Sequence, residues 1–426
     1  MNNMFWNKLR IIFKDRDLRK KILFVALVLV LFRIGSSIPI PGIDQARLAS
    51  FLSGNQFFGL LNIFSGGGLS NLSIVMLGVA PYITATIIMQ LLTMIFPKLK
   101  EMYHEEGEAG KQKFNQYSRM LTIPLAFLQG FGLLALLGRE GIIANLGLFD
   151  KIVNIIIVIT GSVILMWLGE LISEYGIGNG VSLLIFAGIV ASLPGTIQQI
   201  AFTFDYSQIP LYLGFIIASV FVVAGVIVIT EAERPIPVSY AKQVRGNKMY
   251  GGASTHLPLR VNQAGVIPII FAISILLFPQ MIANVLASFG GGGIMKTIAN
   301  FLAAFMNNGW LYGASYFILV FAFTYFYTAV TFDPEALSTN LQKSGAFVPG
   351  IRPGRPTAEY IGRVLNRITL VGAVFLGLIA VLPIGMRALT GMQALAMGGT
   401  ALLIVVSVVL ETIKQIESQV VMREYE

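Results

Sequence analysis

The sequence predicts an all-α membrane protein with about ten transmembrane helices. Of its 426 residues, 55% are hydrophobic and 12% are charged, whereas a soluble globular domain carries roughly 25% charged residues. The apolar residues occur in runs of about 20, the length that a helix needs to cross a hydrocarbon layer roughly 30 Å thick. Lys-rich and Lys-poor connections alternate between these runs, as the positive-inside rule requires. A soluble fold is excluded because the chain has too little polar surface.

The apolar runs predict the positions of the helices. We expect transmembrane helices near residues 22–40, 73–96, 119–138, 152–172, 181–201, 210–230, 264–285, 311–331, 367–386 and 393–413. The first run, Ile22–Phe32, is followed by the stretch RIGSSIPIPG rather than by a small-residue cleavage site. We therefore expect it to be a retained helix and not a cleaved signal peptide.

The distribution of Lys and Arg predicts the orientation of these helices. Most of the 30 basic residues lie in the connections on the side of the N-terminus. The opposite side carries only Arg47, Arg139, Lys151, Lys296 and Arg387. Because basic loops remain in the cytoplasm, we expect both termini to be cytoplasmic.

The net charge of +9 is concentrated in the connections 97–118, 232–263 and 332–366. The last two are longer than most connections, and they combine Arg and Lys with Gly and Pro. One interpretation is a topology signal that also contacts anionic lipid headgroups. The other is a docking surface for a large acidic partner such as ribosomal RNA.

The order of the helices suggests two related halves. Five predicted helices lie in residues 1–205 and five in residues 206–426, so the second half begins on the opposite side of the membrane. This arrangement fits an inverted repeat with pseudosymmetric halves.

Candidate catalytic and metal-binding residues are scarce. Arg33, Glu170, Glu231 and Glu411 lie toward the ends of apolar runs, whereas an ion-coupled transporter is expected to keep a charge at the membrane midplane. The sequence lacks phosphate-binding and nucleophile motifs and contains no cysteine, and its two histidines, His104 and His256, lie far apart in polar stretches. We expect no catalytic residue, metal or cofactor. An ion-coupled secondary transporter with inverted repeats is the alternative to a channel.

Two glycine-rich stretches have different interpretations. Residues 55–73 contain an apolar half-helix followed by Gly66, Gly67 and Gly68, which can fold back between other helices or form an amphipathic loop at the membrane interface. The stretch Gly176–Gly180 lacks the strand context of a nucleotide site, so we expect a tight turn that leads into the fifth helix.

Two aliphatic pairs are spaced for one helix face. Val79 and Ile83, and likewise Val181 and Ile185, are four residues apart and therefore stack on the same side of a helix. Taken alone, these pairs are ordinary packing or lipid-facing residues.

Four blocks of sequence together resemble the bacterial SecY family. They are FRIGSSIPIPGID at 32–44, FSGGGLS at 64–70, GIGNG at 176–180 and KSGAFVPGIRPG at 343–354, in the order of the family. The block STHLPLRVN at 254–262 extends the similarity, which runs from the first helix to Glu411. The resemblance implies a channel of the general secretory pathway that passes unfolded polypeptides across the membrane and releases hydrophobic segments sideways into lipid.

The resemblance also implies which residues form the channel. An aliphatic collar at the waist of the pore would consist of Val79, Ile83, Val181, Ile185, Ile270 and Ile404. A plug helix between helices 1 and 2, near 57–70, would include Phe57, Leu60, Leu61, Asn62, Ile63, Phe64, Ser65, Gly66, Gly67 and Gly68. A lateral gate would carry Thr84, Gln90, Gln129 and Ser274. Positions 79 and 181 hold valine where the family often has the larger isoleucine.

The implied partners and location follow from the same resemblance. The docking residues would be Arg245, Lys248, Arg352 and Arg355, facing the SecA motor ATPase or the ribosome through its RNA. The other implied partners are the SecE and SecG subunits, secretory preproteins with their signal sequences, and anionic lipids. The implied location is the bacterial plasma membrane.

Overall fold

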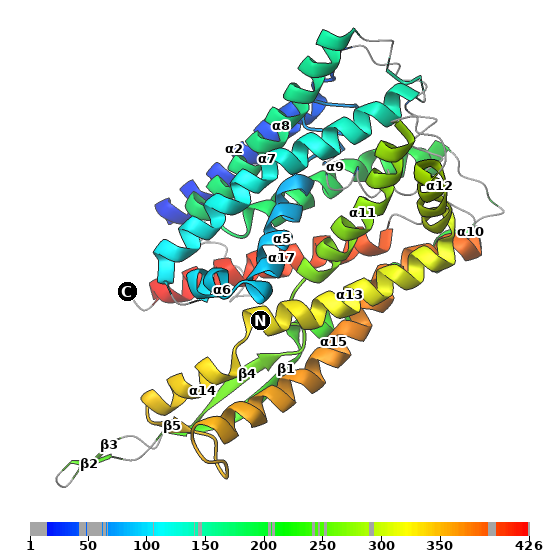
Figure 1. Cartoon of the computed structure of the whole chain (residues 1–426). Helices are drawn as coiled ribbons and strands as arrows, with labels where there is room; N and C mark the ends of the chain where they lie inside the picture. The colour runs from blue at the N-terminus through cyan, green and yellow to red at the C-terminus, as the bar shows by residue number, and fades with distance from the viewer. Residues whose placement is uncertain are drawn as a thin grey trace.

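The structure, a computed structural model, is mostly helical (Figure 1). It describes residues 15–41, 67–104, 106–139, 141–143, 147–202, 209–240, 243–245, 248–250, 254–288, 294–390 and 398–424, together with residues 48, 62, 65 and 206.

Each predicted apolar run contains a helix in the described part of the chain. These helices are α2 (Arg16–Ser37), α5 (Ala80–Ile95), α7 (Gly107–Arg139), α8 (Leu148–Tyr175), α9 (Gly180–Phe202), α10 (Ile209–Glu231), α11 (Ile267–Ser288), α13 (Gly309–Thr331), α15 (Arg355–Thr390) and α17 (Gly398–Glu424). Among the described residues, five helices are long and apolar enough to cross a membrane. A sixth candidate is the pair α5 and α6 (Pro97–His104), which meet at a bend of 116°. The chain is therefore a multi-pass membrane protein, and the count of ten spans stays a prediction.

The prediction of a helix over residues 73–96 is wrong for its first seven residues. Residues 67–79 form a series of turns, and α5 begins only at Ala80. The backbone is left-handed at Gly67 and Gly78, and also at Leu72, where φ is 40°. A left-handed residue breaks a right-handed helix, so the apolar character of this segment serves packing and not membrane crossing.

The basic connections are folded, contrary to the expectation of loops. Residues 97–118 form α6 and the start of α7. The connections 232–263 and 332–366 come together as the antiparallel sheet β4-β1-β5, built from β1 (Glu233–Tyr240), β4 (Ser254–Arg260) and β5 (Ala346–Phe347). The hairpin of β2 (Gln243–Arg245) and β3 (Lys248–Tyr250) extends from this sheet (Figure 1).

This sheet has a hydrophobic core of its own. With α14 (Pro334–Lys343) and the first turns of α15, it encloses the buried side chains of Ile236, Leu259, Val348 and Ile361. We call β1, β4, β5, α14 and the first turns of α15 the sheet module. It joins two segments that are separated in the sequence by the 73 residues between Arg260 and Pro334.

The main hydrophobic cluster joins the two sequence halves. Helix α11 packs against α5 and α7, and α17 packs against α9. Helix α12 (Ile294–Asn307), which the apolar runs did not predict, packs beside α11 (Figure 1). Among the described residues, contacts between residues 1–205 and 206–426 include those of α11 with α5 and α7 and of α17 with α9, and Val420 of α17 also packs with Leu18 and Ile177.

The turn predicted at Gly176–Gly180 is confirmed. Helix α8 ends at Tyr175, Gly178 has a φ of 92°, and α9 begins at Gly180. This sharp reversal brings the start of α9 back against the end of α8.

Candidate pore and gate

The six predicted collar residues come from four separate elements and lie in one hydrophobic cluster. Val79 and Ile83 lie at the start of α5, Val181 and Ile185 on α9, Ile270 on α11 and Ile404 on α17. All are buried except Val181, which is partly buried and packs against the cluster. Val79 precedes the first turn of α5, and the Ile83 amide donates to its carbonyl at 3.0 Å. The pair thus keeps a helical spacing although Val79 lies outside the helix.

Two adjoining cavities reach four of these six residues. A cavity of about 640 Å³ is lined in part by Ile83, Val181 and Ile270. A second cavity, of about 450 Å³, is lined in part by Ile270 and Ile404. Ile270 lines both cavities, whereas Ile83 and Val181 line only the larger one and Ile404 lines only the smaller one. Val79 and Ile185 line neither and are packed within the cluster.

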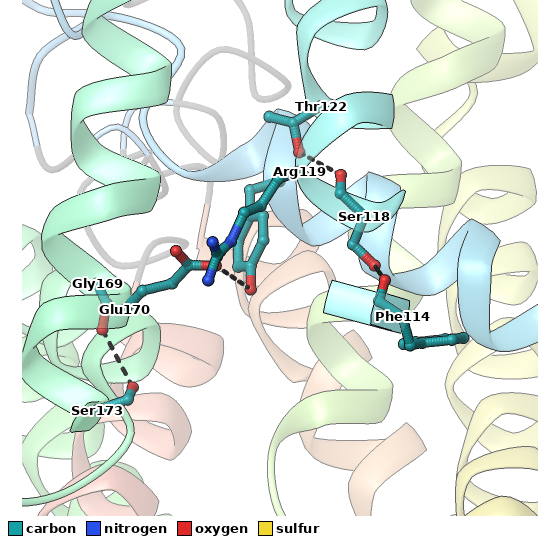
Figure 2. A network of polar contacts seen from close by, with 8 residues as sticks. Phe114, Ser118, Arg119, Thr122, Gly169, Glu170 and Ser173 are labelled. Carbon is teal, nitrogen blue, oxygen red and sulfur yellow. Dashed lines mark hydrogen bonds and ion pairs between the residues drawn. The ribbon is translucent and has the colours of Figure 1, made fainter. Parts of the chain in front are cut away.

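The walls of the larger cavity are polar. Arg119 Nε on α7 donates to Glu170 Oε1 on α8 at 2.8 Å, and the Tyr82 hydroxyl on α5 donates to the same oxygen at 3.4 Å (Figure 2). Glu170 is the more buried member of the pair, with 18% of its side chain exposed against 48% for Arg119. The carboxylate thus connects three helices beside the collar.

The walls of the smaller cavity also carry ion pairs. Lys414 Nζ lies 2.8 Å from Glu231 Oε1, and Arg260 Nε lies 3.5 Å from Glu233 Oε1. Lys414 and Arg260 line this cavity together with Glu411.

The Glu170 carboxylate and these pairs were visible in the sequence only as charges near the ends of apolar runs. The sequence carried one signal for such pairing, because a carboxylate such as Glu170 inside an otherwise apolar run needs a partner. The identity of that partner follows only from the tertiary structure.

The four predicted gate residues lie on the helices that join the two halves. Thr84 and Gln90 are on α5, Gln129 on α7 and Ser274 on α11, and Thr84, Gln129 and Ser274 are buried. Thr84 Oγ1 and Gln90 Oε1 are buried without a hydrogen-bond partner among the residues that the structure describes. Such oxygens weaken the packing of these helices, because a buried polar group without a partner is destabilising.

The predicted plug is described only in part. Phe57, Leu60, Leu61, Ile63, Phe64 and Gly66 lie outside the described residues. Asn62 Oδ1 accepts from the Ser70 amide at 2.9 Å, the Asn62 carbonyl accepts from the Gly67 amide at 2.9 Å, and Ser65 Oγ accepts from the Leu69 amide at 3.0 Å. Gly68 is packed so closely that a Cβ there would stand 2.7 Å from Ser73 Oγ. These contacts make the end of the plug region a compact turn.

The predicted docking residues lie at two places in the folded connections. Arg352 is exposed in the turn between β5 and α15, and Arg355 begins α15 with its Nε 3.4 Å from Glu359 Oε1. Arg245 and Lys248 are paired in the backbone register of the β2–β3 hairpin.

No metal site accompanies these features in the described residues. No group of three or more His, Asp or Glu residues there could hold a metal ion, and His256 is exposed on β4.

Comparisons with known proteins agree on one family. The SecY family model matches residues 73–413. A protein translocase subunit SecY from Corynebacterium glutamicum is 45% identical over 439 residues, which cover 97% of this chain and 98% of the relative. The SecY subunit of Mycobacterium tuberculosis strain H37Rv is 43% identical over 433 residues, with 96% of each chain covered.

A comparison with solved structures supports the same fold. A solved structure described as a protein-conducting channel superposes with a TM-score of 0.65 at 21% identity, covering 93% of this chain and 91% of that one. The Sec61 channel in a canine ribosome-channel complex gives a TM-score of 0.63 at 20% identity, with the same coverage. The all-α membrane fold is therefore that of these channels, and this chain belongs to the SecY family.

Proposed function

We propose that this chain is the protein-conducting channel of a bacterial secretory pathway, with the six aliphatic residues as the collar of its pore. The observation that carries the proposal is that aliphatic residues of α5, α9, α11 and α17 belong to one hydrophobic cluster or pack against it, and that Ile270 lines both cavities beside this cluster. Relatives of near-complete length are named as protein translocase subunits and not as enzymes.

A collar of this chemistry suits a channel for unfolded chains. Apolar side chains offer water and ions no hydrogen bonds, so a narrow empty collar dewets and stays closed. The same side chains make only non-directional contacts, so the collar accepts polypeptides of any sequence. An ion-coupled transporter, the alternative, needs a charged group at this point. Here the aliphatic cluster occupies it, and the nearby Glu170 is paired with Arg119.

The plug and the lateral gate belong to the same proposal. The segment 57–70 closes the external side of the resting collar, and its glycines allow it to swing away. Hydrophobic segments leave sideways between α5 and α7 on one side and α11 on the other. The Thr84 hydroxyl has no hydrogen-bond partner among the described residues, and hydrogen bonds between helices in a membrane contribute only about 0.6 kcal/mol on average, so this is the seam that separates.

The sheet module is the proposed docking surface on the cytoplasmic side, where both termini also lie. Its exposed Arg352 and Arg355 suit an acidic partner, and the canine Sec61 structure is described as a complex of ribosome and channel. We infer that the ribosome and the SecA motor bind here, that SecE and SecG complete the channel in the plasma membrane, and that anionic lipids contact the remaining basic residues.

Polar substitution in the collar tests the channel function. Ile270→Asn and Ile404→Asn each place an amide where the closed collar excludes water, so we expect the resting ion conductance of the purified channel in planar bilayers to rise several-fold. Ile404→Leu keeps the position apolar and serves as the control. Unchanged resting conductance in both Asn variants, at normal folding, would remove the collar from the mechanism.

Charge reversal on the sheet module tests the docking surface. Arg352→Glu reverses an exposed charge without touching the core of the module, so we expect motor-driven transport of a preprotein into membrane vesicles to fall several-fold. Lys100→Glu makes the same change on α6 and should have little effect. Equal transport by the Arg352→Glu variant and the wild type, at equal expression, rules out this role for Arg352.

A further inference from the structure

We propose that one turn of α8, Gly169–Ser173, positions the collar residues that the N-terminal half contributes, and that Gly180 is the residue on which this positioning depends most. The inference rests on the proposed channel function and extends it to residues outside the collar. It starts from the close contact between the end of α8 and the start of α9.

Gly180 lies directly against the backbone of α8. A Cβ at this position would collide with the Gly169 carbonyl oxygen and stand 2.7 Å from Ile172 Cβ. The Gly180 amide donates to Ser173 Oγ at 2.9 Å, and Ser173 Oγ donates to the Gly169 carbonyl at 3.1 Å. The first residue of α9 is thus fixed on α8 by hydrogen bonds and by a contact that only glycine permits.

Val181, the next residue, packs on the same turn of α8. A Cβ added at Gly169 would stand 3.2 Å from Val181 Cγ2, so the valine lies against nearly bare backbone. The other side of Val181 faces the larger cavity. The spacing between α8 and α9 therefore sets how far this collar residue reaches toward Ile83 and Ile270.

Glu170, the residue after Gly169 on α8, holds the start of α5 by a hydrogen bond. Glu170 Oε1 accepts from Arg119 Nε at 2.8 Å and from the Tyr82 hydroxyl at 3.4 Å (Figure 2). Tyr82 precedes Ile83 in the sequence, as Gly180 precedes Val181. Two adjacent residues of α8, Gly169 and Glu170, thus hold the residues that precede two collar residues on two different helices.

A methyl group at position 180 must push the start of α9 away from α8. Packed protein interiors transmit such a strain because they contain few voids that can absorb it. Val181 and Ile185 move with the helix, so the collar loses its fit to Ile83 and Ile270. We therefore expect a leak in a protein that is still folded.

The experiment compares Gly180→Ala with Gly195→Ala. Both glycines lie in α9, but a Cβ at Gly195 meets nothing within 4 Å among the residues that the structure describes. Resting ion conductance is measured in planar bilayers, and thermal unfolding is measured in detergent on the same preparations. We expect a several-fold rise in resting conductance for Gly180→Ala and wild-type conductance for Gly195→Ala.

A second variant keeps the test decisive if Gly180→Ala does not fold. Ser173→Ala adds no volume, but it removes the hydroxyl that accepts a hydrogen bond from the Gly180 amide. We therefore expect a smaller rise in conductance than in Gly180→Ala. Leu259→Ala, in the core of the sheet module, controls for loss of stability alone and should leave the resting conductance unchanged.

The outcomes separate this inference from the proposed function. Wild-type conductance in folded Gly180→Ala, or in Ser173→Ala where the first variant does not fold, would overturn the positioning role if Ile404→Asn leaks in the same assay. Absence of a leak in both Ile270→Asn and Ile404→Asn would instead overturn the collar. A leak in Leu259→Ala as large as that in Gly180→Ala would show that lost stability, and not position, opens the pore.

Discussion

At Gly161, helix α8 has no side chain because the turns of residues 67–79 pass directly over it. A Cβ at this glycine would collide with the Ile74 carbonyl oxygen. The adjacent Ser162 Oγ donates to the Gly78 carbonyl at 3.0 Å, deep in the protein. On the other side, the Ile40 amide donates to the Leu72 carbonyl at 2.9 Å. The chain between the plug region and α5 is therefore held to α8 and to the extended residues that follow α2.

Gly161→Ala should destabilise the protein by about 1 to 3 kcal/mol, the usual range for an overpacked core. The added methyl group has to displace a backbone carbonyl and not a flexible side chain. The measurement is the denaturation midpoint in detergent micelles.

Gly138→Ala on α7 is the matched control, because a Cβ there meets nothing within 4 Å. It should leave stability unchanged or raise it by up to about 1 kcal/mol through helix propensity. Equal midpoints for the two alanine variants would contradict the close contact at Gly161.

At the scale of elements, the sheet module explains how two long basic connections keep a defined shape outside the membrane. Along β1, Ile236 and Val238 are buried while the neighbouring Pro235 and Pro237 are exposed, which is the period of two expected for a strand with one covered face. The covered face packs on Val348, from the other connection. Neither connection can bury its apolar residues without the other.

Leu259→Ala should therefore loosen residues that are distant in the sequence. Removing a fully buried leucine destabilises a core by about 2 to 5 kcal/mol, and this core is shared by the two connections. We expect faster amide hydrogen exchange both in β1 and in residues 346–351.

Thr255→Ala, at an exposed position of the same strand, is the control and should leave exchange unchanged. If Leu259→Ala accelerated exchange in β4 and β1 alone, the two connections would be independent units.

At the scale of the whole molecule, the two sequence halves meet along several lines of contact in the described part of the chain, and two of these lines differ in the side chains that their helices carry. Helix α17 contacts α9, and the two helices contribute Ile404 and Ile185 to the main hydrophobic cluster. The contact of α11 with α5 and α7 contains buried polar side chains, including Thr84, Gln129 and Ser274. The second line is the weaker one, because the Thr84 hydroxyl lacks a hydrogen-bond partner in the described part of the chain.

Thr84→Val tests this difference. The substitution keeps the shape and removes a buried hydroxyl whose burial costs about 1 to 3 kcal/mol by mutational data. We expect a higher denaturation midpoint and slower preprotein transport, because the closed seam becomes more stable than the open one.

Thr324→Val on α13 is the control, since that hydroxyl is buried but donates to the Val320 carbonyl at 2.7 Å. Faster transport by the Thr84→Val variant would contradict a seam that has to separate.

The sequence by itself determined the helices and the membrane character, because the length of an apolar run and the placement of Lys and Arg are set by the bilayer and not by neighbouring helices. Each predicted run contains a helix, and the turn at Gly176–Gly180 follows from its glycines. The sequence motifs also indicated the family.

Contacts between distant residues were decided only by the tertiary structure. Hydropathy did not distinguish the turns at 67–79 from a transmembrane helix, because Leu72, Val75 and Met76 are apolar and lie buried in the main hydrophobic cluster. The meeting of Ile83, Val181, Ile270 and Ile404, the pairing of Arg119 with Glu170, and the joining of two basic connections in one core depend on how helices pack. An aliphatic residue has the same local pattern whether it faces lipid, a neighbouring helix or a pore, so its role is fixed by the packing around it.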